Sequence, residues 1–455
     1  MPLVPCTSRH HRSPAVREHT GPNASRSCPT KETRERHCEP ERRTAGRTVA
    51  SVGTVFEFAD VEAARDRLQG IIRPTPTVRS DVFSDLVGRP VYFKPEHLQR
   101  TGSFKIRGAY NRISRIAEDD PAATVVAASA GNHAQGVALA ASLCGLTSTI
   151  FMPKDSSLPK LEATRHYGAQ VELGGGSVDE CIARAIVFAA ANGAIYVPPF
   201  DDPLVAAGQG TIGIELAAEA PPLETVLVPI GGGGLIAGVA RAIRACMPGA
   251  RVVGVEAAGA ASMIAAQRAG FPVDLPSART VADGIAVGRV CDLTLAHVAA
   301  DVDDVVTVDD ETISRAVVLL LERAKWVVEP AGAVGVAALL SGVIAGSGPV
   351  GVVLSGGNVD PLLLTRLIDH GLTASGRYLL LRVVIDDRPG TLAALTASIA
   401  AMDLNVLGVE HHRSGTVVGV TEVEVLMTVE TRDPRHRDAV VATLREAGFD
   451  ASIRS

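Results

Sequence analysis

Residues 124–136 read Thr-Val-Val-Ala-Ala-Ser-Ala-Gly-Asn-His-Ala-Gln-Gly, and this stretch decides the fold class. It begins with a short apolar run rich in β-branched residues, which is typical of a buried strand. The small residues that follow are typical of a tight loop leading into a helix. A strand, a loop and a helix in this order form the repeating unit of α/β layer proteins, whose sheets are mostly parallel.

The same unit recurs between about Phe56 and His370. Further short apolar runs predict buried strands at Ser148–Met152, Gln170–Leu173, Ile195–Val197, Thr225–Ile230, Arg251–Val255 and Pro349–Leu354. The stretches between them predict helices, among them Ser177–Asn192, Leu235–Cys246 and Glu311–Lys325. We therefore expect one α/β unit over residues 54–372, with a small subdomain of about 124–200 inserted in a larger one.

The pattern changes after Gly376. The order strand, helix, strand, strand, helix, strand is predicted at Tyr378–Ile385, Thr391–Met402, Asn405–His411, Thr416–Thr428, about Pro434 to Ala447, and Asp450–Arg454. A turn at Asp387–Gly390 joins the first two elements. This βαββαβ order is that of a ferredoxin-like module, which we place at residues 378–455. It lacks clustered nucleophiles, so we expect no second catalytic centre there.

Length and composition exclude several classes of protein. A chain of 455 residues exceeds the roughly 250–300 residues that one hydrophobic core supports. The formal charge of −6 gives the whole chain no attraction to nucleic acid or to anionic lipid. The longest uncharged run, Ala331–Val359, is broken by glycines and Pro349, which argues against a membrane span. Seven cysteines without a paired CxxC motif favour a reducing cytosol, so we expect a cytoplasmic protein.

The first fifty residues differ from the rest of the chain. They contain ten Lys and Arg against five Asp and Glu, and they have almost no apolar periodicity. Such a segment cannot bury enough apolar surface to offset the entropy of ordering it. We therefore predict a disordered basic tail over residues 1–53, which is passive or lies upstream of the mature protein. An organellar transit peptide and a nucleic-acid-binding arm are the alternatives; the five acidic residues weaken the first and the absence of interleaved aromatic residues weakens the second.

Lys105 is the first residue to which the sequence assigns a chemical role. It begins a predicted helix whose apolar face starts with Ile106 and continues at helical spacing. A lysine at a helix start opposes the helix dipole, and the apolar neighbours Phe104 and Ile106 disfavour its charge. Both effects lower the pKa of the amine and make it available for a Schiff base. A solvated surface lysine is the alternative.

The loop Ser129–His133 follows the strand predicted at Thr124–Ala127. Small residues between a strand and a helix present several backbone N–H groups, which bind anions such as a carboxylate. Asn132 can offer its amide to a ring hydroxyl. His133 is better suited to a structural hydrogen bond than to the role of a base.

A run of glycines, Gly231–Gly234, lies between another predicted strand and helix and is followed by Leu235. Glycines let the backbone wrap a phosphate at a helix N-terminus. The run has neither the Lys-[Ser/Thr] ending of a P-loop nor the GxGxxG spacing of a dinucleotide site. A phosphate monoester on a small cofactor fits it better than a nucleotide does.

Ser355 closes the last strand of the expected main sheet, where α/β proteins bind ligands. The four segments therefore offer an amine, an amide, a phosphate cradle and a hydroxyl at one end of one scaffold. An amine for an aldehyde, an amide for a ring oxygen, a cradle for a phosphate and a hydroxyl for a ring nitrogen converge on pyridoxal 5′-phosphate.

In this order the four segments resemble those of the fold-type II pyridoxal-phosphate enzymes, and of the threonine dehydratases (threonine ammonia-lyases) in particular. Supporting stretches of the same family stand at Pro198–Pro203, Ala207–Thr211, Ala282–Gly284 and Glu329–Ala333. The resemblance covers roughly Val55 to Leu372 and implies a two-domain fold similar to that of the tryptophan synthase β chain. The segment from Tyr378 onward resembles an ACT domain, an amino-acid-sensing module.

The resemblance implies a role for each site residue. Lys105 would hold the cofactor covalently and remove the Cα proton of the substrate, and Ser355 would face the pyridine nitrogen. Phe104 would pack beside the ring, and Asn132 would contact its 3′-hydroxyl. The phosphate would be wrapped by Gly231, Gly232, Gly233, Gly234 and Leu235. The substrate carboxylate would be clamped by Ser129, Ala130, Gly131, Asn132 and His133.

Two positions depart from related families. Ala130 stands where the serine racemases have a serine that serves as a base, which argues against racemisation. Glu256 fits the first position of a divalent-metal site known in the racemase branch, but Ser262 replaces the carboxylate expected nearby. We therefore predict no metal site, with Glu256 as the candidate ligand if one exists.

The activity implied is deamination of L-threonine to 2-oxobutanoate and ammonia by elimination of water, with L-serine as a secondary substrate that gives pyruvate. A serine racemase, or another fold-type II enzyme acting on hydroxy amino acids, is the first alternative. An amino-acid-responsive regulatory protein with a decayed catalytic half is the second. A role in isoleucine biosynthesis and a catabolic role both remain open.

The ACT resemblance implies regulation. The turn at Asp387–Gly390 and the helix that begins at Thr391 would bind isoleucine or valine between paired modules. We therefore expect a homodimer or homotetramer. The alternative is that the module serves only to hold an oligomer together. No nucleic acid or membrane partner is expected.

Overall fold

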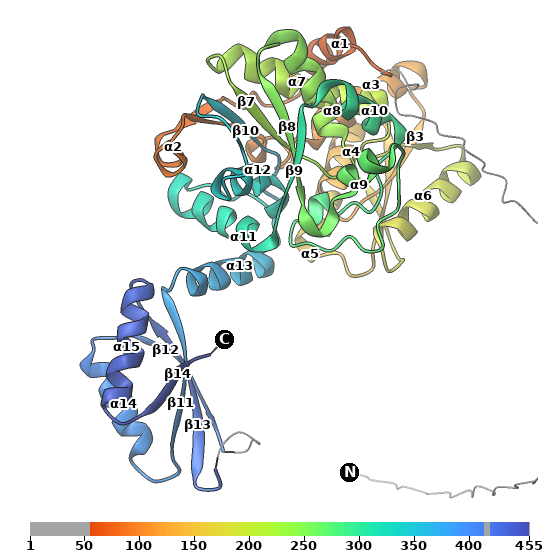
Figure 1. Ribbon diagram of the computed structural model, residues 1–455. Coiled ribbons are helices and arrows are strands. Elements are labelled where there is room, and N and C mark those ends of the chain that lie inside the picture. The colour runs from red at the N-terminus through yellow and green to blue at the C-terminus, as the bar shows by residue number, and fades with distance from the viewer. Residues whose placement is uncertain (1–54, 414–418, 455) are drawn as a thin grey trace, which may run out of the picture. The chain divides into compact units, whose positions relative to one another are not determined.

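The protein is described by a computed structural model over residues 55–413 and 419–454, and its strands form three sheets (Figure 1). The predicted basic tail of residues 1–53 lies outside the described residues, as do the first residues of the predicted strand Thr416–Thr428. The predicted α/β class with mostly parallel sheets is confirmed.

The largest sheet has six strands in the order β1-β2-β10-β7-β8-β9. Their bounds are β1 (Val78–Ser80), β2 (Val91–Pro95), β10 (Val350–Leu354), β7 (Thr225–Pro229), β8 (Arg251–Ala257) and β9 (Asp304–Val308). Only the β1–β2 pair is antiparallel. Every residue of β7 and β10 is buried, because helices cover both faces of a parallel sheet.

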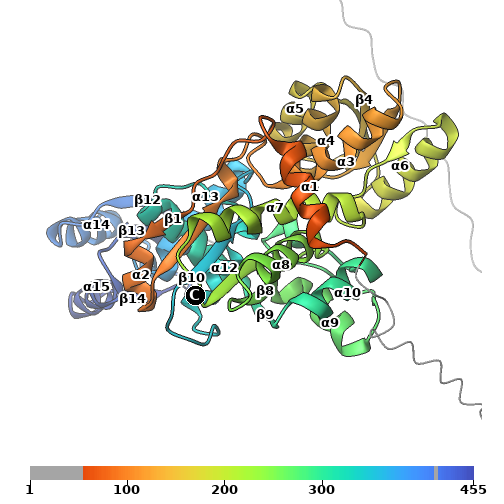
Figure 2. The ribbon, with the colours of Figure 1, turned by 90° about the horizontal axis from the view of Figure 1, so that it is seen from above.

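A second sheet of four parallel strands lies between β2 and β7 in the sequence. Its order is β5-β4-β3-β6, with the bounds β3 (Thr124–Ala128), β4 (Thr147–Met152), β5 (Gln170–Leu173) and β6 (Ile195–Tyr196). Helices α3 (Lys105–Asp119), α4 (Asn132–Leu143), α5 (Leu158–His166) and α6 (Val178–Asn192) gather around it (Figure 2). Ile106, Ala109 and Ile113 of α3 share a hydrophobic core with Val125 and Val137.

The other helices that precede β11 in the chain surround the six-stranded sheet (Figure 2). They are α1 (Phe58–Leu68), α2 (Asp81–Val87), α7 (Pro203–Glu219), α8 (Gly234–Cys246), α9 (Ser262–Ala269), α10 (Asp292–Asp301), α11 (Asp310–Leu319), α12 (Pro330–Leu340) and α13 (Pro361–Ala374). Short 3₁₀ turns stand at Glu96–Leu98, Ala258–Ala260 and Asp283–Ile285. The uncharged run Ala331–Val359 divides into α12 and β10, and no helix of the described residues is long and apolar enough to cross a membrane.

The structure corrects the prediction of one helix at Glu311–Lys325. The α-helix α11 ends at Leu319, and a π-helical turn occupies Leu320–Ala324. Lys325 then adopts φ 63°, a left-handed conformation that ends the helix. A π-turn of this kind has no clear signature in apolar periodicity.

The C-terminal sheet is antiparallel, with the order β12-β13-β11-β14. Its strands are β11 (Tyr378–Asp386), β12 (Val406–His412), β13 (Glu422–Glu430) and β14 (Asp450–Ile453). Helices α14 (Thr391–Ala401) and α15 (Pro434–Glu446) cover one face (Figure 1), where Leu395 and Leu444 pack on Leu381 and Val425. The βαββαβ order is as predicted and fits an ACT-like domain. The strand predicted at Thr416–Thr428 begins later, at Glu422.

Candidate functional site

The candidate site lies at the carboxyl ends of parallel strands from both sheets of the first part. The loop Ser129–Gly131 follows β3, the glycine run follows β7, and Ser355 follows β10. Ligands of α/β proteins bind at this end of a sheet because the loops there are free to shape a crevice. Three of the four predicted segments are therefore loops of this kind, and the fourth begins α3.

Lys105 is the first residue of α3. Its Nζ donates a hydrogen bond to the carbonyl oxygen of Pro199 at 2.9 Å and lies 5.1 Å from the centre of the Phe104 ring. Part of the side chain stays accessible, but protein atoms surround the amine. Burial lowers its pKa to about 8, against the opposing charge of Glu329. This agrees with the direction expected from the sequence, and burial is the cause of the shift.

Asn132 is the first residue of α4, so its side chain stands at the start of the helix that follows β3. Its Nδ2 donates to Oε1 of Glu329 at 2.6 Å, and its Oδ1 accepts from Nδ2 of Asn358 at 2.8 Å. The hydroxyl of Ser129 accepts the N–H of Gly131 at 3.1 Å and so braces the loop before the helix. The NH₂ group and the oxygen of the Asn132 amide therefore each have a hydrogen-bond partner in the protein.

His133 is almost completely buried, and its Nε2 lies 2.9 Å from the carbonyl oxygen of Val197. Burial lowers its pKa to about 3, and the nearby charge of Lys105 acts in the same direction. The ring is therefore neutral at any physiological pH. His133 holds α4 against the chain that leads to Pro199, which is a structural role.

The glycine run forms the turn between β7 and α8. Gly233 has φ 91°, a conformation that side chains rarely adopt, and α8 begins at Gly234. A Cβ atom at Gly232 or Gly234 would collide with Phe200, and one at Gly233 would lie 2.8 Å from Met263 and Thr294. The turn therefore accepts only glycine, and it leads directly into the N-terminus of α8, where a helix favours a bound phosphate.

Ser355 is 3% exposed, and its carbonyl oxygen accepts the N–H of Phe104 at 3.1 Å. Ser103 also forms a β-bridge with Gly356. Ser355 directly follows β10, so its hydroxyl stands at the carboxyl end of the sheet, where α/β proteins bind ligands.

These contacts bring the four predicted segments together. The backbone bond from Phe104 to Ser355 joins the lysine segment to the loop after β10. The bond between Asn132 and Asn358 joins that loop to α4. Phe200 packs on the glycines, and the preceding carbonyl at Pro199 accepts the Lys105 amine. An amine, an amide, a hydroxyl and a helix N-terminus are thus connected through neighbouring segments.

Glu256 has a local structural partner. Its two carboxylate oxygens accept the N–H groups of Met263 and Ile264 at 2.7 and 3.0 Å, at the start of α9. Burial raises its pKa to about 7. The described part of the chain contains no group of three or more His, Cys, Asp or Glu side chains that could hold a metal ion.

The sequence interpretation missed three contributors. Glu329 and Asn358 contact Asn132, and Phe200 lies over the glycine run. Glu329 and Phe200 fall in stretches that supported the resemblance, but neither had been given a role. Asn358 ends the segment that contains Ser355. The sequence motifs could therefore have pointed to these residues. The hydrogen bonds between distant motifs could not be predicted from the motifs alone.

Comparisons with known proteins place the chain among its relatives. The family model for pyridoxal-phosphate dependent enzymes matches residues 68–356. An L-threonine ammonia-lyase of Thermotoga maritima is 44% identical over 399 residues, which cover 88% of this chain and 100% of that protein. The processed form of threonine deaminase isoform 2 from Solanum lycopersicum matches with a TM-score of 0.65 at 35% identity, over 70% of this chain and 95% of its own. Maize serine racemase matches with a TM-score of 0.65 at 35% identity, over 70% and 98%.

Proposed function

The chain belongs to the pyridoxal-phosphate dependent enzyme family, and we propose that it deaminates L-threonine to 2-oxobutanoate and ammonia, with L-serine as a secondary substrate that gives pyruvate. The observation that carries the proposal is Lys105, whose amine has a lowered pKa and bonds to Pro199, the residue before the Phe200 that packs on the glycine run. The L-threonine ammonia-lyase from Thermotoga maritima, similar over its whole length, supports the choice of substrate.

The residues present fit pyridoxal 5′-phosphate. The glycine turn after β7 is too closely packed to accept a Cβ atom, and it leads into the N-terminus of α8, which favours a phosphate. The hydroxyl of Ser355 can pair with the ring nitrogen, and Lys105 can hold the aldehyde carbon. Phe104 and Asn132 would lie against the ring and its hydroxyl.

When bound, the cofactor supplies an electron sink that makes the Cα–H bond of an amino acid acidic. The chain does the rest. The neutral amine of Lys105 accepts the Cα proton, and the segment Ser129–His133, which leads into the N-terminus of α4, holds the carboxylate. The hydroxyl of Ser355 carries no charge. It can therefore orient the ring through a hydrogen bond without placing a negative charge beside the ring nitrogen. Loss of the β-hydroxyl as water, followed by hydrolysis, gives one keto acid and one ammonia per threonine.

A racemase is the alternative that shares this fold, as the match to maize serine racemase illustrates. Racemisation needs a group that delivers a proton to the face of the substrate opposite the lysine. The alanine at position 130 has no such group. This chain's own residues therefore favour elimination over racemisation.

Steady-state rates of keto-acid formation from L-threonine and L-serine test the proposal, together with chiral analysis of the serine that remains. Rapid 2-oxobutanoate formation with no D-serine is the expected result. D-serine as the main product would establish the racemase. A purified protein without the visible absorbance band of the bound cofactor, and without turnover, would leave a regulatory protein.

Residues 378–455 are proposed to regulate this activity. A cavity of about 490 Å³ is lined by Asp386 and Thr391, on either side of the Asp387–Gly390 turn, and by Arg382 and Phe449. This is the place where the resemblance to ACT domains predicts a bound amino acid. Isothermal titration with isoleucine and valine, with threonine kinetics in parallel, should give heat and a change in rate. Neither heat nor a rate change would leave the module with a purely structural role.

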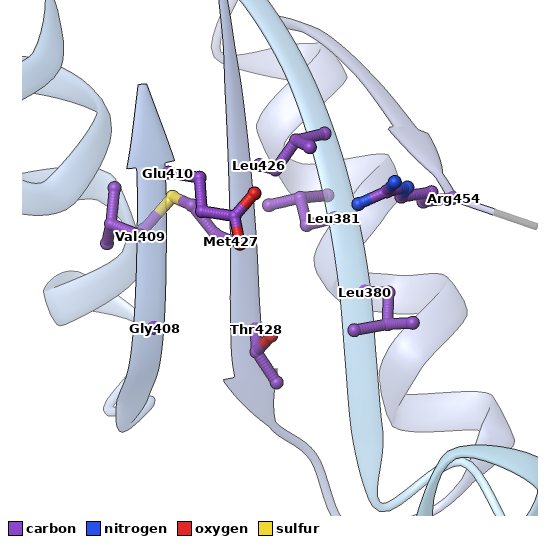
Figure 3. A pocket seen from close by; sticks show the side chains of 9 residues that line it. All are labelled: Leu380, Leu381, Gly408, Val409, Glu410, Leu426, Met427, Thr428 and Arg454. Carbon is purple, nitrogen blue, oxygen red and sulfur yellow. The ribbon is translucent and has the colours of Figure 1, made fainter. Parts of the chain in front are cut away.

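The sheet face opposite α14 and α15 supports the proposed dimer or tetramer. A shallow hollow of about 80 Å³ lies on the sheet, with lining residues from β11, β12 and β13 and with Arg454 beside them (Figure 3). Every residue of β12 is exposed, including Leu407 and Val409. An exposed edge strand with apolar side chains favours pairing with another copy. Light scattering of the purified chain measures its molar mass, which should be two or four times that of one chain.

Replacing Gly232 by alanine should weaken cofactor binding by about tenfold or more, because the added methyl group must displace the Phe200 ring that covers the cradle. Titration of the apoprotein with pyridoxal 5′-phosphate, followed by its absorbance, measures the dissociation constant. Gly249→Ala is the matched control, since a Cβ atom there meets nothing within 4 Å. Equal affinities in the two variants would contradict the assignment of the cradle.

A further inference from the structure

We propose that Glu329 and Asn358 are positioning residues that fix the orientation of the Asn132 amide toward the ring oxygen of the cofactor. This inference rests on the proposed function, which supplies the cofactor. It adds two side chains from different elements to the site. Glu329 directly precedes α12, and Asn358 follows β10.

The hydrogen bonds around Asn132 distinguish the two ends of its amide. When ionised, the carboxylate of Glu329 can only accept, so it selects the NH₂ group of Asn132 at 2.6 Å. The Nδ2 of Asn358 can only donate, so it selects the oxygen of Asn132 at 2.8 Å. A reversed amide would place an oxygen against the carboxylate and one NH₂ group against another. The partners therefore determine the orientation, and one N–H of Asn132 remains for a ligand.

Asn358 is itself held in place. Its Nδ2 also donates to the carbonyl oxygen of Thr101 at 2.7 Å, in the segment that leads to Lys105. The N–H of Gly357 donates to the carbonyl oxygen of Gly102 at 2.9 Å. The orientation of the Asn132 amide is thus tied to the same backbone that places Lys105.

Glu329 is equally constrained. It is 3% exposed, and its backbone N–H donates to the carbonyl oxygen of Gly356 at 3.0 Å. A Cβ atom at Gly356 would overlap its carboxylate and would lie 3.1 Å from Nδ2 of Asn132. The close approach of carboxylate, amide and glycine leaves Glu329 little freedom to turn away.

The charges that face Glu329 come from several elements. Burial raises the pKa of its carboxyl group to about 7, and Asp283 adds to that rise. The amide of Asn132 and the amines of Lys160 and Lys105 oppose it. The charge of Glu329 therefore changes near neutral pH, and with it the strength of the bond to Asn132, since charge-assisted hydrogen bonds are the stronger kind.

The test compares Glu329→Ala, Glu329→Gln and Asn358→Ala with the unaltered protein. The dissociation constant of pyridoxal 5′-phosphate and the position of its visible absorbance band are measured from pH 5.5 to 9 (a range of about one and a half units or more on each side of neutrality). Glu329→Ala and Asn358→Ala should weaken binding about tenfold and shift the band, because the amide loses a fixed orientation. Glu329→Gln should recover most of the affinity, since its amide oxygen still accepts, and should lose the spectral change near neutral pH.

Glu256→Gln is the control, because it shows whether the replacement of any buried carboxylate would have the same effect. Glu256 is also buried, burial also raises its pKa to about 7, and it bonds to backbone N–H groups of α9 instead of to Asn132. The inference is overturned if Glu329→Ala and Asn358→Ala bind the cofactor with unchanged affinity and an unchanged band. Because binding and spectra need no turnover, this outcome is separate from a failure of threonine deamination.

Discussion

Replacing Lys105 by alanine is expected to lower kcat for threonine by on the order of 10³-fold or more, because the variant lacks both the amine that holds the cofactor and the base that accepts the Cα proton. Among residues 55–413 and 419–454, Lys160 is engaged with Asp283 at 2.7 Å, and Lys94 is fully buried between carboxylates. Keto-acid formation under saturating cofactor measures the loss.

Lys154→Ala serves as the control, since Lys154 is an exposed lysine in the segment that follows β4. Borohydride reduction followed by peptide mapping gives the second readout. The unaltered protein and Lys154→Ala should carry the cofactor label at position 105, and Lys105→Ala should carry none. A labelled peptide elsewhere in an active Lys105→Ala variant would mean that the site has been placed on the wrong segment.

The lowered pKa of Lys105 predicts how cofactor uptake depends on pH. The amine attacks an aldehyde only when neutral, and its pKa of about 8 lies below the usual 10.5. The rate of cofactor uptake by the apoprotein should therefore rise by about tenfold per pH unit below pH 8 and level off above it. The charge of Glu329 raises this pKa, so Glu329→Gln should move the transition to lower pH. Stopped-flow absorbance follows the uptake, and a rate independent of pH between 6 and 9 (about one to two units on each side of the transition) would contradict the assignment.

The sequence predicts this fold well where strands are apolar on both faces. Strands β7 and β10 are buried at every residue, and their apolar composition predicts this burial without knowledge of the neighbouring strands. Strand β2 carries no such marker, because Lys94 lies within it and lysine is rarely buried. In the structure Lys94 is fully buried and pairs with Glu215 at 2.8 Å, a partner over a hundred residues away. Strand β9 was missed because it is a partly exposed edge strand.

The candidate site likewise has residues that the sequence identifies and residues that only the folded structure reveals. Lys105, Asn132, the glycine run and Ser355 carry chemical groups suited to one cofactor, so residue type and order were enough to single them out. Glu329 and Asn358 act through contacts with Asn132 across 197 and 226 residues of sequence. Nothing local marks such a pair, because its hydrogen bonds exist only once two sheets and their loops are assembled.

Replacing Arg107 by methionine is expected to cost about 3–5 kcal/mol of stability, because it leaves a buried carboxylate without its partner. Arg107 lies on α3, two residues after Lys105, and is fully buried. Its Nε and Nη2 each donate to the carboxylate of Glu96 at 2.8 Å, and its Nη1 and Nη2 donate to Glu215. Burial by itself lowers the pKa of the guanidinium, but the charges of Glu96 and Glu215 outweigh burial and raise it.

The midpoint of urea unfolding of the apoprotein measures the loss, and three companions interpret it. Arg115→Met removes an exposed ion pair with Glu118 on the same helix and should change stability by less than about 1 kcal/mol. Arg107→Lys keeps the charge but not the paired geometry, so its loss should be intermediate. Adding Glu96→Gln to Arg107→Met should restore part of the stability, because the uncompensated charge is then gone. If Arg107→Met and Arg115→Met unfolded at the same midpoint, the buried network would contribute no more than a surface pair, and the placement of Lys105 at the start of α3 would have to depend on the apolar packing of that helix alone.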